Sequence, residues 1–482
     1  MHLYQLFQHA LQGRKDHAAL HFDGYDYTFG DIDRRSKHMA VYLQQQGLQK
    51  GDRLCVYLEN CVEMIDLYLA CTQLGIIFVP MNIMYREREL THIIGDAAPK
   101  LIVSDGPIPG GFASVYRADI APIAAQTHDV QLDALPLSGD DPAALVYTSG
   151  TTGLSKGAML THNNLMFNGM ALSSCWKITA EDRFMLALPL FHVHALANGI
   201  HSWLISGCHM QLLPRFEYQK AEAQFLDYQP TLFFGVPTIY IRLLDWSAEV
   251  AQRVGSKARL FVCGSAPLPA QVLEDFEAKF GHVILERYGM TETLMNLSNP
   301  YHGKRKAGTV GMALPGISVK IVKTDGQLAA LEEEGEVHIK GPNVCAGYWN
   351  RPDATRDAFD AEGYFKTGDM GQWDAEGYIT LKGRKSDLII SGGFNIYPRE
   401  IEEFLVEQPG VLEAAVVGVP HETRGEMPVA YLVTGPEYQA EATQAACQTT
   451  FASFKVPRAF IQVDQLPRTA LGKVQKHLLP KP

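Results

Sequence analysis

Apolar and polar positions form a regular pattern between Thr28 and Gln46, where apolar residues return at the spacing of one helix face. Thr28 and Asp31 have the spacing of a capping box, and Gly47 follows as a stop signal. The pattern therefore predicts a helix from Thr28 to Gln46. Further helical stretches follow, among them the apolar segment Cys61–Leu74.

Short apolar runs, each long enough for a buried strand, alternate with these helical stretches. This order is typical of parallel sheets whose faces are covered by helices. Because ligands bind beyond the carboxyl ends of such strands, we expect the chemistry at that edge. The predicted strands are Arg53–Leu58, Ile76–Pro80, Leu101–Ser104, Ala143–Tyr147, Leu232–Gly235, Leu260–Gly264 and Val283–Tyr288.

The pattern changes after about Gly383, where strands alternate with helices that begin near Pro398 and Glu441. We predict an α/β protein in two domains. Residues 1–383 would form a large N-terminal domain of layered β-α-β sheets with a smaller β-rich subdomain, and residues 384–482 a small, mobile α+β domain. The strands predicted in the small domain and before it are Tyr378–Leu381, Asp387–Ser391, Ala414–Val419, Val429–Val433 and Phe460–Val463.

The composition supports more than one globular body. The 482 residues include 46% apolar and 20% charged side chains, and a single hydrophobic core seldom grows beyond about 300 residues. The 53 acidic side chains outnumber the 42 of lysine and arginine, which gives a net charge of −11. No broad basic surface is therefore expected to attract nucleic acid, and anionic ligands would need local positive sites.

Apolar runs and cysteines indicate the compartment. No apolar run approaches the ~20 residues of a membrane-spanning helix, and Met1–Phe7 do not resemble the start of a secretory signal. The eight cysteines form no Cys-x-x-Cys pair, which favours buried, reduced thiols over disulfides or zinc ligands. We expect a cytoplasmic protein without a membrane span.

The stretch from Tyr147 to Gly157 carries the strongest chemical signal. It combines glycines, which let backbone amides approach an anion, with hydroxyl side chains and the cation of Lys156. It predicts a phosphate cradle, with an exposed hairpin turn as the alternative. Because Lys156 precedes Gly157, the stretch does not match the Walker A pattern. The predicted nucleotide contacts here are Thr148, Ser149, Gly150, Thr151, Thr152, Gly153 and Lys156.

Four further short segments lie at predicted strand ends or loops, and a fifth lies near the end of the sequence. Together with the hydroxyl-rich stretch, and in the same order over nearly the whole chain, they resemble the adenylate-forming superfamily of acyl-CoA synthetases, luciferases and nonribosomal adenylation domains. Any one motif is weak, but the series is specific. The segments are Gly264–Pro267, Tyr288–Thr293, Thr367–Asp369, Gly383–Arg384 and Gly472–Lys473.

The resemblance implies an AMP-forming acyl-CoA synthetase that uses ATP, Mg²⁺ and coenzyme A. A carboxylate would attack the α-phosphate of ATP, release pyrophosphate and become an acyl-adenylate, which the thiol of coenzyme A would then attack. The Gly264–Pro267 turn and the ring of Tyr288 would enclose the adenine. The nucleotide contacts implied here are Gly264, Ser265, Ala266, Pro267, Arg287, Tyr288, Gly289, Met290 and Thr291.

The same resemblance implies roles for charged groups. Glu292 would hold Mg²⁺, with Thr152 close by. Asp369 would accept the ribose hydroxyls, and Arg384 would donate to the ribose or a phosphate. Lys473 would bridge the attacking carboxylate and the phosphate as a mobile cation. The implied catalytic residues are Lys473, Glu292 and Thr152.

The resemblance also implies that the small domain rotates between the two half-reactions. A glycine pair in one of its loops would let the pantetheine arm of coenzyme A pass close to the backbone, with a plain turn as the alternative. At the pivot, where the family often carries Asp or Lys, this chain has Ser386, so the pivot residue is left open. The implied coenzyme A contacts are Ser391, Gly392, Gly393 and Phe394.

Segments 189–194 and 286–293 resemble those of malonyl-CoA synthetases. A small dicarboxylate would need a buried cation for its distal carboxylate. Arg287 is the candidate, unless its side chain points outward. Against malonate, the segment Ala195–Gly199 departs from the Gly-Leu expected there.

Other acids and acceptors stay open. An apolar pocket lined by Phe233, Phe234, Gly235 and Val236 would favour a medium-chain or aromatic acid. We interpret His192 as a wall or gate of the acyl pocket rather than as a metal ligand with His194. The predicted acyl contacts are thus His192, Arg287, Phe233 and Gly235. A stand-alone adenylation module that loads a carrier protein is the alternative from another class, and the sequence does not predict the oligomeric state.

Overall fold

The computed structural model describes residues 1–148, 155–391, 394–421, 424–469 and 472–480. The predicted α/β class, with a large N-terminal part built on sheets and a small C-terminal part, is confirmed. The boundary at Gly383–Arg384 and the mobility of the small part stay predictions. The chain folds into two compact units, unit 1 with Met1–Ala307, Gly311–Ser318 and Ile339–Phe365, and unit 2 with Gly308–Val310, Val319–His338 and Lys366–Pro482.

One sheet of unit 1 has six strands in the described residues. They are β3 (Arg53–Tyr57), β4 (Ile77–Pro80), β5 (Leu101–Ser104), β6 (Val115–Tyr116), β7 (Pro142–Thr148) and β8 (Lys156–Thr161), in the order β6-β5-β3-β4-β7-β8. All pairs are parallel except that β8 returns antiparallel to β7. The helices of this region are α2 (Phe29–Gln45), α3 (Val62–Leu74), α4 (Glu87–Ala97) and α5 (Arg117–Ala124).

The second sheet of unit 1 joins nine strands in the order β15-β14-β13-β12-β11-β9-β10-β1-β2 among the described residues. Its middle strands, from β13 to β1, are parallel, and the outer pairs are antiparallel. The strands are β1 (Ala18–Phe22), β2 (Tyr25–Thr28), β9 (Arg183–Leu186), β10 (His209–Leu212), β11 (Leu232–Gly235), β12 (Leu260–Cys263), β13 (Leu285–Met290), β14 (Leu294–Ser298) and β15 (Met312–Ala313).

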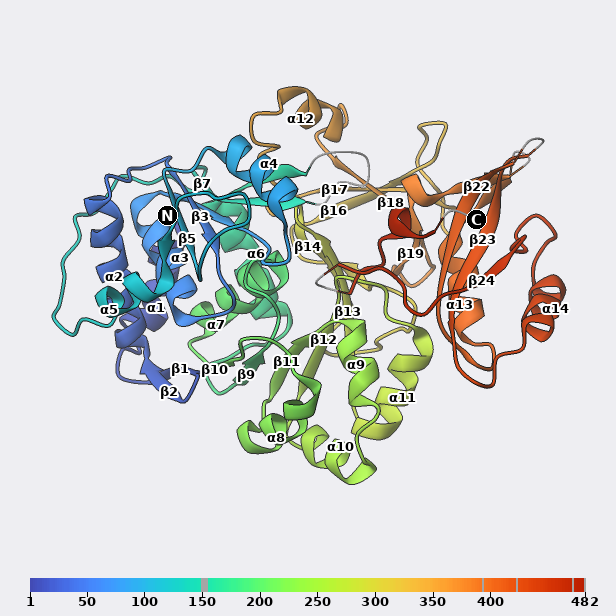
Figure 1. The fold of residues 1–482 in the computed structure, drawn as a ribbon, viewed down its shortest axis with the longest axis horizontal. Helices are drawn as coiled ribbons and strands as arrows, with labels where there is room; N and C mark the ends of the chain where they lie inside the picture. The colour runs from blue at the N-terminus through green and yellow to red at the C-terminus, as the bar shows by residue number, and fades with distance from the viewer. Residues whose placement is uncertain (149–154, 392–393, 422–423, 470–471, 481–482) are drawn as a thin grey trace. The chain divides into compact units, whose positions relative to one another are not determined.

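Helices cover this sheet and complete unit 1. In Figure 1, helices α8, α9, α10 and α11 lie around strands β11 and β12. The helices are α1 (Leu3–Leu11), α6 (His162–Cys175), the π-helix η1 (His194–Ile200), α7 (His201–Ser206), α8 (Tyr218–Tyr228), α9 (Pro237–Leu243), α10 (Ala248–Gly255), α11 (Ala270–Phe280) and α12 (Pro352–Ala358). Large aromatic side chains on or next to these helices, among them Trp176, Trp203, Phe225 and Tyr240, are fully buried and help to fill the core.

Two further sheets contain most of unit 2. The first has β16 (Ser318–Val322), β17 (Gly335–Lys340), β18 (Phe365–Trp373) and β19 (Ile379–Arg384) in this order. The second has the order β21-β20-β23-β22, and β24 also pairs with β23; β22 and β23 form its long antiparallel ribbon (Figure 1). Its elements are β20 (Ile389–Ser391), β21 (Phe394–Ile396), β22 (Val411–His421), β23 (Gly425–Thr434), β24 (Phe460–Gln462), α13 (Pro398–Val406), α14 (Ala440–Thr450), and the 3-10 turns η2 (Lys385–Asp387) and η3 (Lys476–Leu478).

The structure confirms most predicted elements and corrects one placement. Helix α2 begins after its cap Thr28, whose hydroxyl accepts the amide of Asp31, as predicted. Segment Thr367–Asp369 lies inside strand β18 rather than at a strand end or in a loop, because Gly368 takes a φ of +72° without interrupting the strand.

The sequence predicts reduced, buried cysteines and no membrane-spanning segment. All eight cysteines lie in the described residues and are unpaired, and burial raises the pKa of most of their thiols. No helix of the described residues is long and apolar enough to cross a membrane.

One buried ion pair joins the beginnings of β9, β11 and β12. Asp182 accepts Arg259 Nε at 2.7 Å and Nη2 at 2.5 Å, and also the hydroxyl of Thr231 at 2.6 Å. Burial alone would raise the pKa of Asp182, but these hydrogen bonds outweigh it and hold the pKa below its ordinary value.

Asp182→Asn should therefore destabilise the protein by about 2 to 3 kcal/mol at neutral pH, because it leaves the guanidinium without its carboxylate. The depressed pKa makes this contribution complete above about pH 4, and the difference between wild type and variant should shrink as the pH falls through the folded pKa. Urea denaturation followed by circular dichroism measures both. Asp353→Asn, which breaks the exposed pair with Arg356, should cost under about 0.5 kcal/mol; equal losses in the two variants would contradict the role of Asp182.

Candidate active site

The hydroxyl-rich stretch lies in the β7–β8 hairpin. Thr148 is the last residue of β7 and pairs with Lys156, the first residue of β8, and the Thr148 hydroxyl points to the Lys156 carbonyl at 3.5 Å. The predicted contacts Ser149, Gly150, Thr151, Thr152 and Gly153 lie outside the described residues. Their roles, including the Mg²⁺ role of Thr152, stay predictions.

Helix α4 holds both ends of this hairpin turn. The hydroxyl of Tyr147 donates to Asp96 Oδ2 at 2.8 Å, and His92 Nε2 donates to the carbonyl of Ser155 at 2.7 Å. The ring of Tyr147 also covers Gly157, where a Cβ would lie 3.0 Å from the ring. These contacts hold the end of β7 and the residue just before β8 in place, on either side of residues 149–154 in the sequence.

A second group of predicted residues meets at the carboxyl ends of β11, β12 and β13, the edge at which parallel sheets bind ligands. Gly264 and Ser265 follow β12, and Arg287 lies in β13. Ser265 has a φ of +72°, a left-handed conformation that is unusual for a residue with a side chain. Its hydroxyl shares a hydrogen bond of 3.1 Å with His194 Nδ1. Backbone strain here marks a candidate functional turn.

Arg287 does not point outward; its side chain is buried, with only 5% of the residue exposed. The guanidinium lies against Gly264, where a Cβ would come within 2.4 Å of Cζ. Among the described residues, Nε and Nη2 have no hydrogen-bond partner and no carboxylate forms an ion pair with this side chain. Burial lowers its pKa to about 10, so the group is still cationic at neutral pH.

His194 stands beside this cation, and His192 lies two residues before His194 in the chain. His194 opens the π-helix η1, and π-helical turns are rare and often occur at functional sites. Burial, reinforced by the nearby charge of Arg287, lowers the pKa of His194 well below its ordinary value. Burial also lowers the pKa of His192 to about 4. Within the described residues, His194 Nε2 is buried and has no hydrogen-bond partner.

The two phenylalanines of β11 face different neighbours. Phe233 packs against Phe225 of α8, 4.9 Å between ring centroids, and against Tyr240 of α9. Phe234 instead stacks on His194 at 6.0 Å. Of the phenylalanines named for the apolar acyl pocket, the structure therefore brings Phe234 to the histidine, while the acyl role of Phe233 stays a prediction. A Cβ at Gly235 would lie 2.8 Å from the ring of Tyr240.

The segment from Tyr288 to Glu292 ends β13 and turns into β14. Gly289 sits in an irregular pair where a Cβ would fall 2.0 Å from the carbonyl oxygen of Leu294, so no larger residue fits. Glu292 is buried, and the hydroxyl of Tyr348 donates to its Oε1 at 3.0 Å. Met290 and Thr291 lie between them, in the strand and the turn.

Sequence reasoning missed the residues that hold this turn. The amide of Asn343 donates to the carbonyls of Thr293 and Met295, at 2.5 and 3.1 Å, and the backbone amide of Cys345 donates to the Glu292 carbonyl at 2.7 Å. These partners lie about fifty positions further along the chain, and no local pattern signals such contacts.

In unit 2, Asp369 and Arg384 form a pair across strands β18 and β19. Arg384 Nε lies 2.9 Å from Asp369 Oδ1, and Arg384 Nη1 donates to the carbonyl of Thr367 at 2.9 Å. The hydroxyl of Thr367 donates to the carbonyl of Val337. The structure thus brings two predicted ribose ligands together on a braced strand, and their roles stay predictions.

The other predicted residues of unit 2 lie on separate elements. Ser391 ends β20 and pairs with Phe394 of β21, while Gly392 and Gly393 lie outside the described residues. Lys473 is exposed and lies on a turn in which its backbone amide donates to the hydroxyl of Thr469.

Arg468 braces the turn that carries Lys473. It donates to the carbonyl of Gly472 at 2.5 Å and pairs with Glu413 at 2.9 Å. Ser386, at the expected pivot, lies in the 3-10 turn η2, and its neighbour Lys385 pairs with Glu336 at 2.8 Å.

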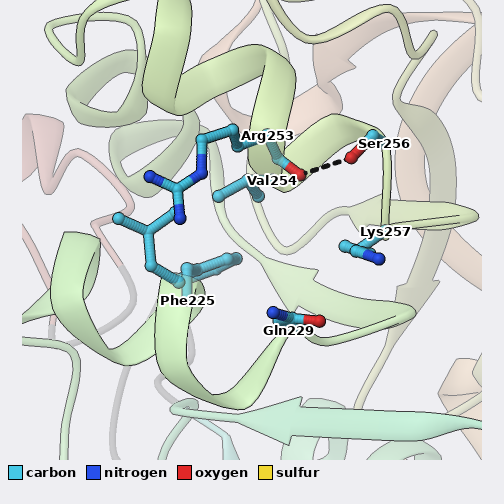
Figure 2. A pocket seen from close by; sticks show the side chains of 7 residues that line it. Phe225, Gln229, Arg253, Val254, Ser256 and Lys257 are labelled. Atoms are coloured by element: carbon cyan, nitrogen blue, oxygen red, sulfur yellow. Dashed lines mark hydrogen bonds between the residues drawn. The ribbon is translucent and has the colours of Figure 1, made fainter.

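A surface pocket of about 200 Å³ lies between helices α8 and α10 (Figure 2). The hydroxyl of Ser256 donates to the carbonyl of Arg253 there, at 2.7 Å. Gln229 and Lys257 of this pocket come just before strands β11 and β12, so they lie at the amino ends of these strands, opposite the edge where the predicted site residues gather. The pocket is lined by Phe225, Leu226, Gln229, Arg253, Val254, Ser256 and Lys257.

The described residues contain no cluster of three or more His, Cys, Asp or Glu side chains that could hold a metal ion. Glu292 offers a single buried carboxylate. Mg²⁺ binds through one or two carboxylates together with substrate phosphates and water, so this site fits Mg²⁺ that arrives with a nucleotide better than a metal held by protein alone.

Comparison with protein families gives two matches along the chain. Residues 7–349 match the AMP-binding enzyme family, and residues 400–473 match the C-terminal domain of AMP-binding enzymes. The first match contains Lys156, Arg287 and Glu292, and the second ends at Lys473.

The relatives of this chain include CoA ligases that are named for different acids. The chain is 34% identical to the long-chain-fatty-acid–CoA ligase of Bacillus subtilis, over 96% of this chain and 91% of the relative. It is 32% identical to the malonate–CoA ligase of Arabidopsis thaliana, over 97% and 86%. Among solved structures, ATP-bound MatB from Rhodopseudomonas palustris is 38% identical, with a TM-score of 0.91 over 99% of this chain and 98% of that one.

The lowered pKa values predict that His192 and His194 stay neutral near neutral pH. Their imidazole ¹³C–¹H NMR signals, assigned with His192→Asn and His194→Asn, should not shift between about pH 8 and 5.5, whereas free histidine titrates within that range. A midpoint near pH 6.5 for either signal would show that the ring is solvated and would contradict the buried arrangement.

Proposed function

The chain belongs to the AMP-binding enzyme family and is an AMP-forming acyl-CoA synthetase, an acid–thiol ligase, and from this premise we propose that it activates a small dicarboxylic acid such as malonate. It would use ATP with Mg²⁺, and coenzyme A as the acceptor. The relative from Arabidopsis thaliana, named a malonate–CoA ligase, supports this choice of acid.

The observation that carries the proposal is the buried guanidinium of Arg287. A buried charge without a counter-charge is unfavourable by several kcal/mol, and a bound anion offsets that cost. The Nε–Nη2 edge, whose two nitrogens have no partner in the described part of the chain, is the edge that binds a carboxylate through two parallel hydrogen bonds. A monocarboxylic acid would present a methyl group or chain to this charge, whereas a dicarboxylate presents a second carboxylate.

Neighbouring groups add selectivity for a short polar acid. His194 is held by Ser265 and, as a neutral ring, can donate or accept one hydrogen bond through Nε2. Because neither histidine carries a charge at neutral pH, Arg287 supplies the positive charge of this group. His192 would form a wall of the acyl pocket.

In the first half-reaction, the carboxylate oxygen of the acid attacks the α-phosphate of ATP, and pyrophosphate leaves. The protein has to place the two anions together and stabilise the growing charge. Lys156 and the β7–β8 turn would hold the phosphates, and Glu292 would hold Mg²⁺, which neutralises phosphate charge when bound. Asp369 and Arg384 would bind the ribose, and Lys473 would bridge carboxylate and phosphate.

In the second half-reaction, the thiolate of coenzyme A attacks the acyl-adenylate and AMP leaves. Lys473 lies on a different element of unit 2 from Ser391, which ends β20, and Phe394, which begins β21. We propose that the small domain presents Lys473 in the first step and the Ser391–Phe394 segment in the second, so that one mobile element serves both steps.

A longer-chain monocarboxylic acid is the second candidate. The relative from Bacillus subtilis named a long-chain-fatty-acid–CoA ligase supports it, and so does the apolar face that Phe234 presents to His194. Loading of a carrier protein in place of coenzyme A is separated from both by measuring thioester formation on each acceptor.

Arg287→Ala should reduce kcat/KM for malonate by about a hundredfold or more, because the distal carboxylate loses its charge partner. Activity with octanoate should change little. Release of pyrophosphate in the presence of coenzyme A, measured with acetate, malonate, methylmalonate, octanoate and benzoate, tests this. Arg287→Lys should be more active with malonate than Arg287→Ala but less active than the wild type. Lysine keeps the positive charge but lacks the two parallel N–H donors of the guanidinium.

Arg305→Ala is the matched control, because Arg305 is a partly buried arginine whose guanidinium donates to the backbone carbonyls of Pro300 and Tyr301. Its ratio of malonate to octanoate activity should equal that of the wild type. If malonate and methylmalonate are inert in the wild-type enzyme while octanoate reacts, the dicarboxylate proposal is wrong.

Lys473→Ala should reduce adenylation by about 10²- to 10³-fold, because the bridging cation is lost, and leave the conversion of supplied acyl-AMP to acyl-CoA nearly unchanged. Isotope exchange between pyrophosphate and ATP measures the first step, and thioester formation from acyl-AMP the second. Lys476→Ala, which removes a lysine paired with Glu402, is the control. Equal losses in both half-reactions would refute the role of Lys473.

A further inference from the structure

Tyr348 touches two of the groups that the proposed function assigns to ATP and Mg²⁺. Its hydroxyl donates to Glu292 Oε1 at 3.0 Å, and the ammonium nitrogen of Lys156 lies 4.7 Å from the centre of its ring. Lys156 and Glu292 come from different parts of the chain, the β7–β8 hairpin and the turn after β13. One buried phenol thus contacts both the cation and the carboxylate.

The backbone around Tyr348 fixes the phenol in this place. Residues 341–351, the bridging segment, bind the hairpin on one side: Trp349 donates its amide to the Gly157 carbonyl at 2.8 Å, and Ala346 and Gly347 exchange hydrogen bonds with Met159. Gly347 has a φ of +127° and a Cβ there would lie 2.5 Å from Thr355, so the turn before Tyr348 requires glycine.

The other side of the bridging segment binds the turn that carries Glu292. Cys345 donates its amide to the Glu292 carbonyl at 2.7 Å, and Asn343 donates to Thr293 and Met295. The amide of Tyr348 itself donates to the hydroxyl of Thr355 at 2.9 Å. Tyr348 is therefore held between the two elements by backbone contacts that do not depend on its own side chain.

We propose that Tyr348 is a positioning residue that makes the binding of ATP and of Mg²⁺ interdependent, by fixing the Glu292 carboxylate and the Lys156 cation with one side chain. This inference rests on the proposed function, in which Lys156 binds phosphate and Glu292 binds Mg²⁺. A hydrogen bond from the phenol favours the ionised carboxylate and sets the direction of its oxygens. The face of the ring attracts the ammonium and limits its positions.

The two contacts can be removed one at a time. Tyr348→Phe keeps the ring under Lys156 and deletes the hydroxyl, whereas Tyr348→Leu deletes both. Titration calorimetry of ATP binding, with EDTA or with Mg²⁺, gives a readout that does not require turnover. In EDTA, Tyr348→Phe should bind ATP with the affinity of the wild type. Mg²⁺ should raise the affinity for ATP, and the variant should need about tenfold more Mg²⁺ to reach half of that increase. Tyr348→Leu should in addition weaken ATP binding in EDTA by about three- to fivefold.

Tyr364→Phe is the matched control. Tyr364 also lies beneath a lysine, Lys340 at 5.5 Å, and its hydroxyl shares a hydrogen bond of 2.8 Å with Ser318, but it belongs to no predicted site. In Tyr364→Phe, the affinity for ATP in EDTA and the change of that affinity with Mg²⁺ should equal those of the wild type. A Tyr348→Phe variant with wild-type thermal stability but wild-type Mg²⁺ dependence would overturn the inference.

The Glu292→Gln background separates this inference from the proposed function. If Glu292 holds Mg²⁺, Glu292→Gln alone should lose most of the Mg²⁺ effect on ATP binding, and adding Tyr348→Phe should then change nothing further. If Glu292→Gln keeps the wild-type Mg²⁺ effect, the proposed metal role fails. If Glu292→Gln loses the effect but Tyr348→Phe still weakens Mg²⁺ binding in that background, Tyr348 does not act through Glu292 and the inference fails alone.

Discussion

The buried guanidinium of Arg287 is the constraint from which the arrangement of the acid site follows. The guanidinium lies directly against the backbone of residue 264, and this close approach is possible because that residue is glycine. The cost of burying the charge is offset when an anion binds to it. Burial, reinforced by this charge, lowers the pKa of His194, so the imidazole beside Arg287 is neutral. Arg287 is therefore one cation beside a neutral imidazole, set at the carboxyl ends of parallel strands where ligands bind. Substrate selection would depend on how a second carboxylate offsets that single charge.

A second level of organisation joins groups that are distant in sequence. Helix α4 anchors both ends of the β7–β8 turn through Asp96 and His92. The bridging segment ties the same hairpin to the turn with Glu292. In unit 2, strands β18 and β19 hold Asp369 against Arg384. The predicted site residues are thus held in place by contacts from outside their own motifs. Such support keeps charged groups in position before a ligand binds, which is what electrostatic preorganisation requires.

Much of the fold could be predicted from the sequence, because local signals and hydrophobic periods set it. The cap of α2 and the bounds of β5 and β11 follow from residues adjacent in the chain. What a buried parallel strand faces could not be predicted. Such strands are apolar on both sides, so the sequence does not distinguish Phe233, which packs on α8, from Phe234, which meets His194. The sequence predicts the segment Thr367–Asp369 at a strand end or in a loop, but strand β18 accommodates the positive φ of Gly368. Tyr348 and Asn343 act over long sequence separations that no local pattern carries.

The close packing of Gly264 against Arg287 has a consequence for how such an enzyme diverges. A side chain at position 264 would displace the guanidinium, and the same position belongs to the turn expected to enclose adenine. Exchange of the arginine for an apolar residue would leave a void beside a bare glycine, and enlargement of the glycine would be tolerated only after the arginine had gone. Change of acid along a lineage should therefore pass through paired substitutions in a fixed order, with the arginine lost first.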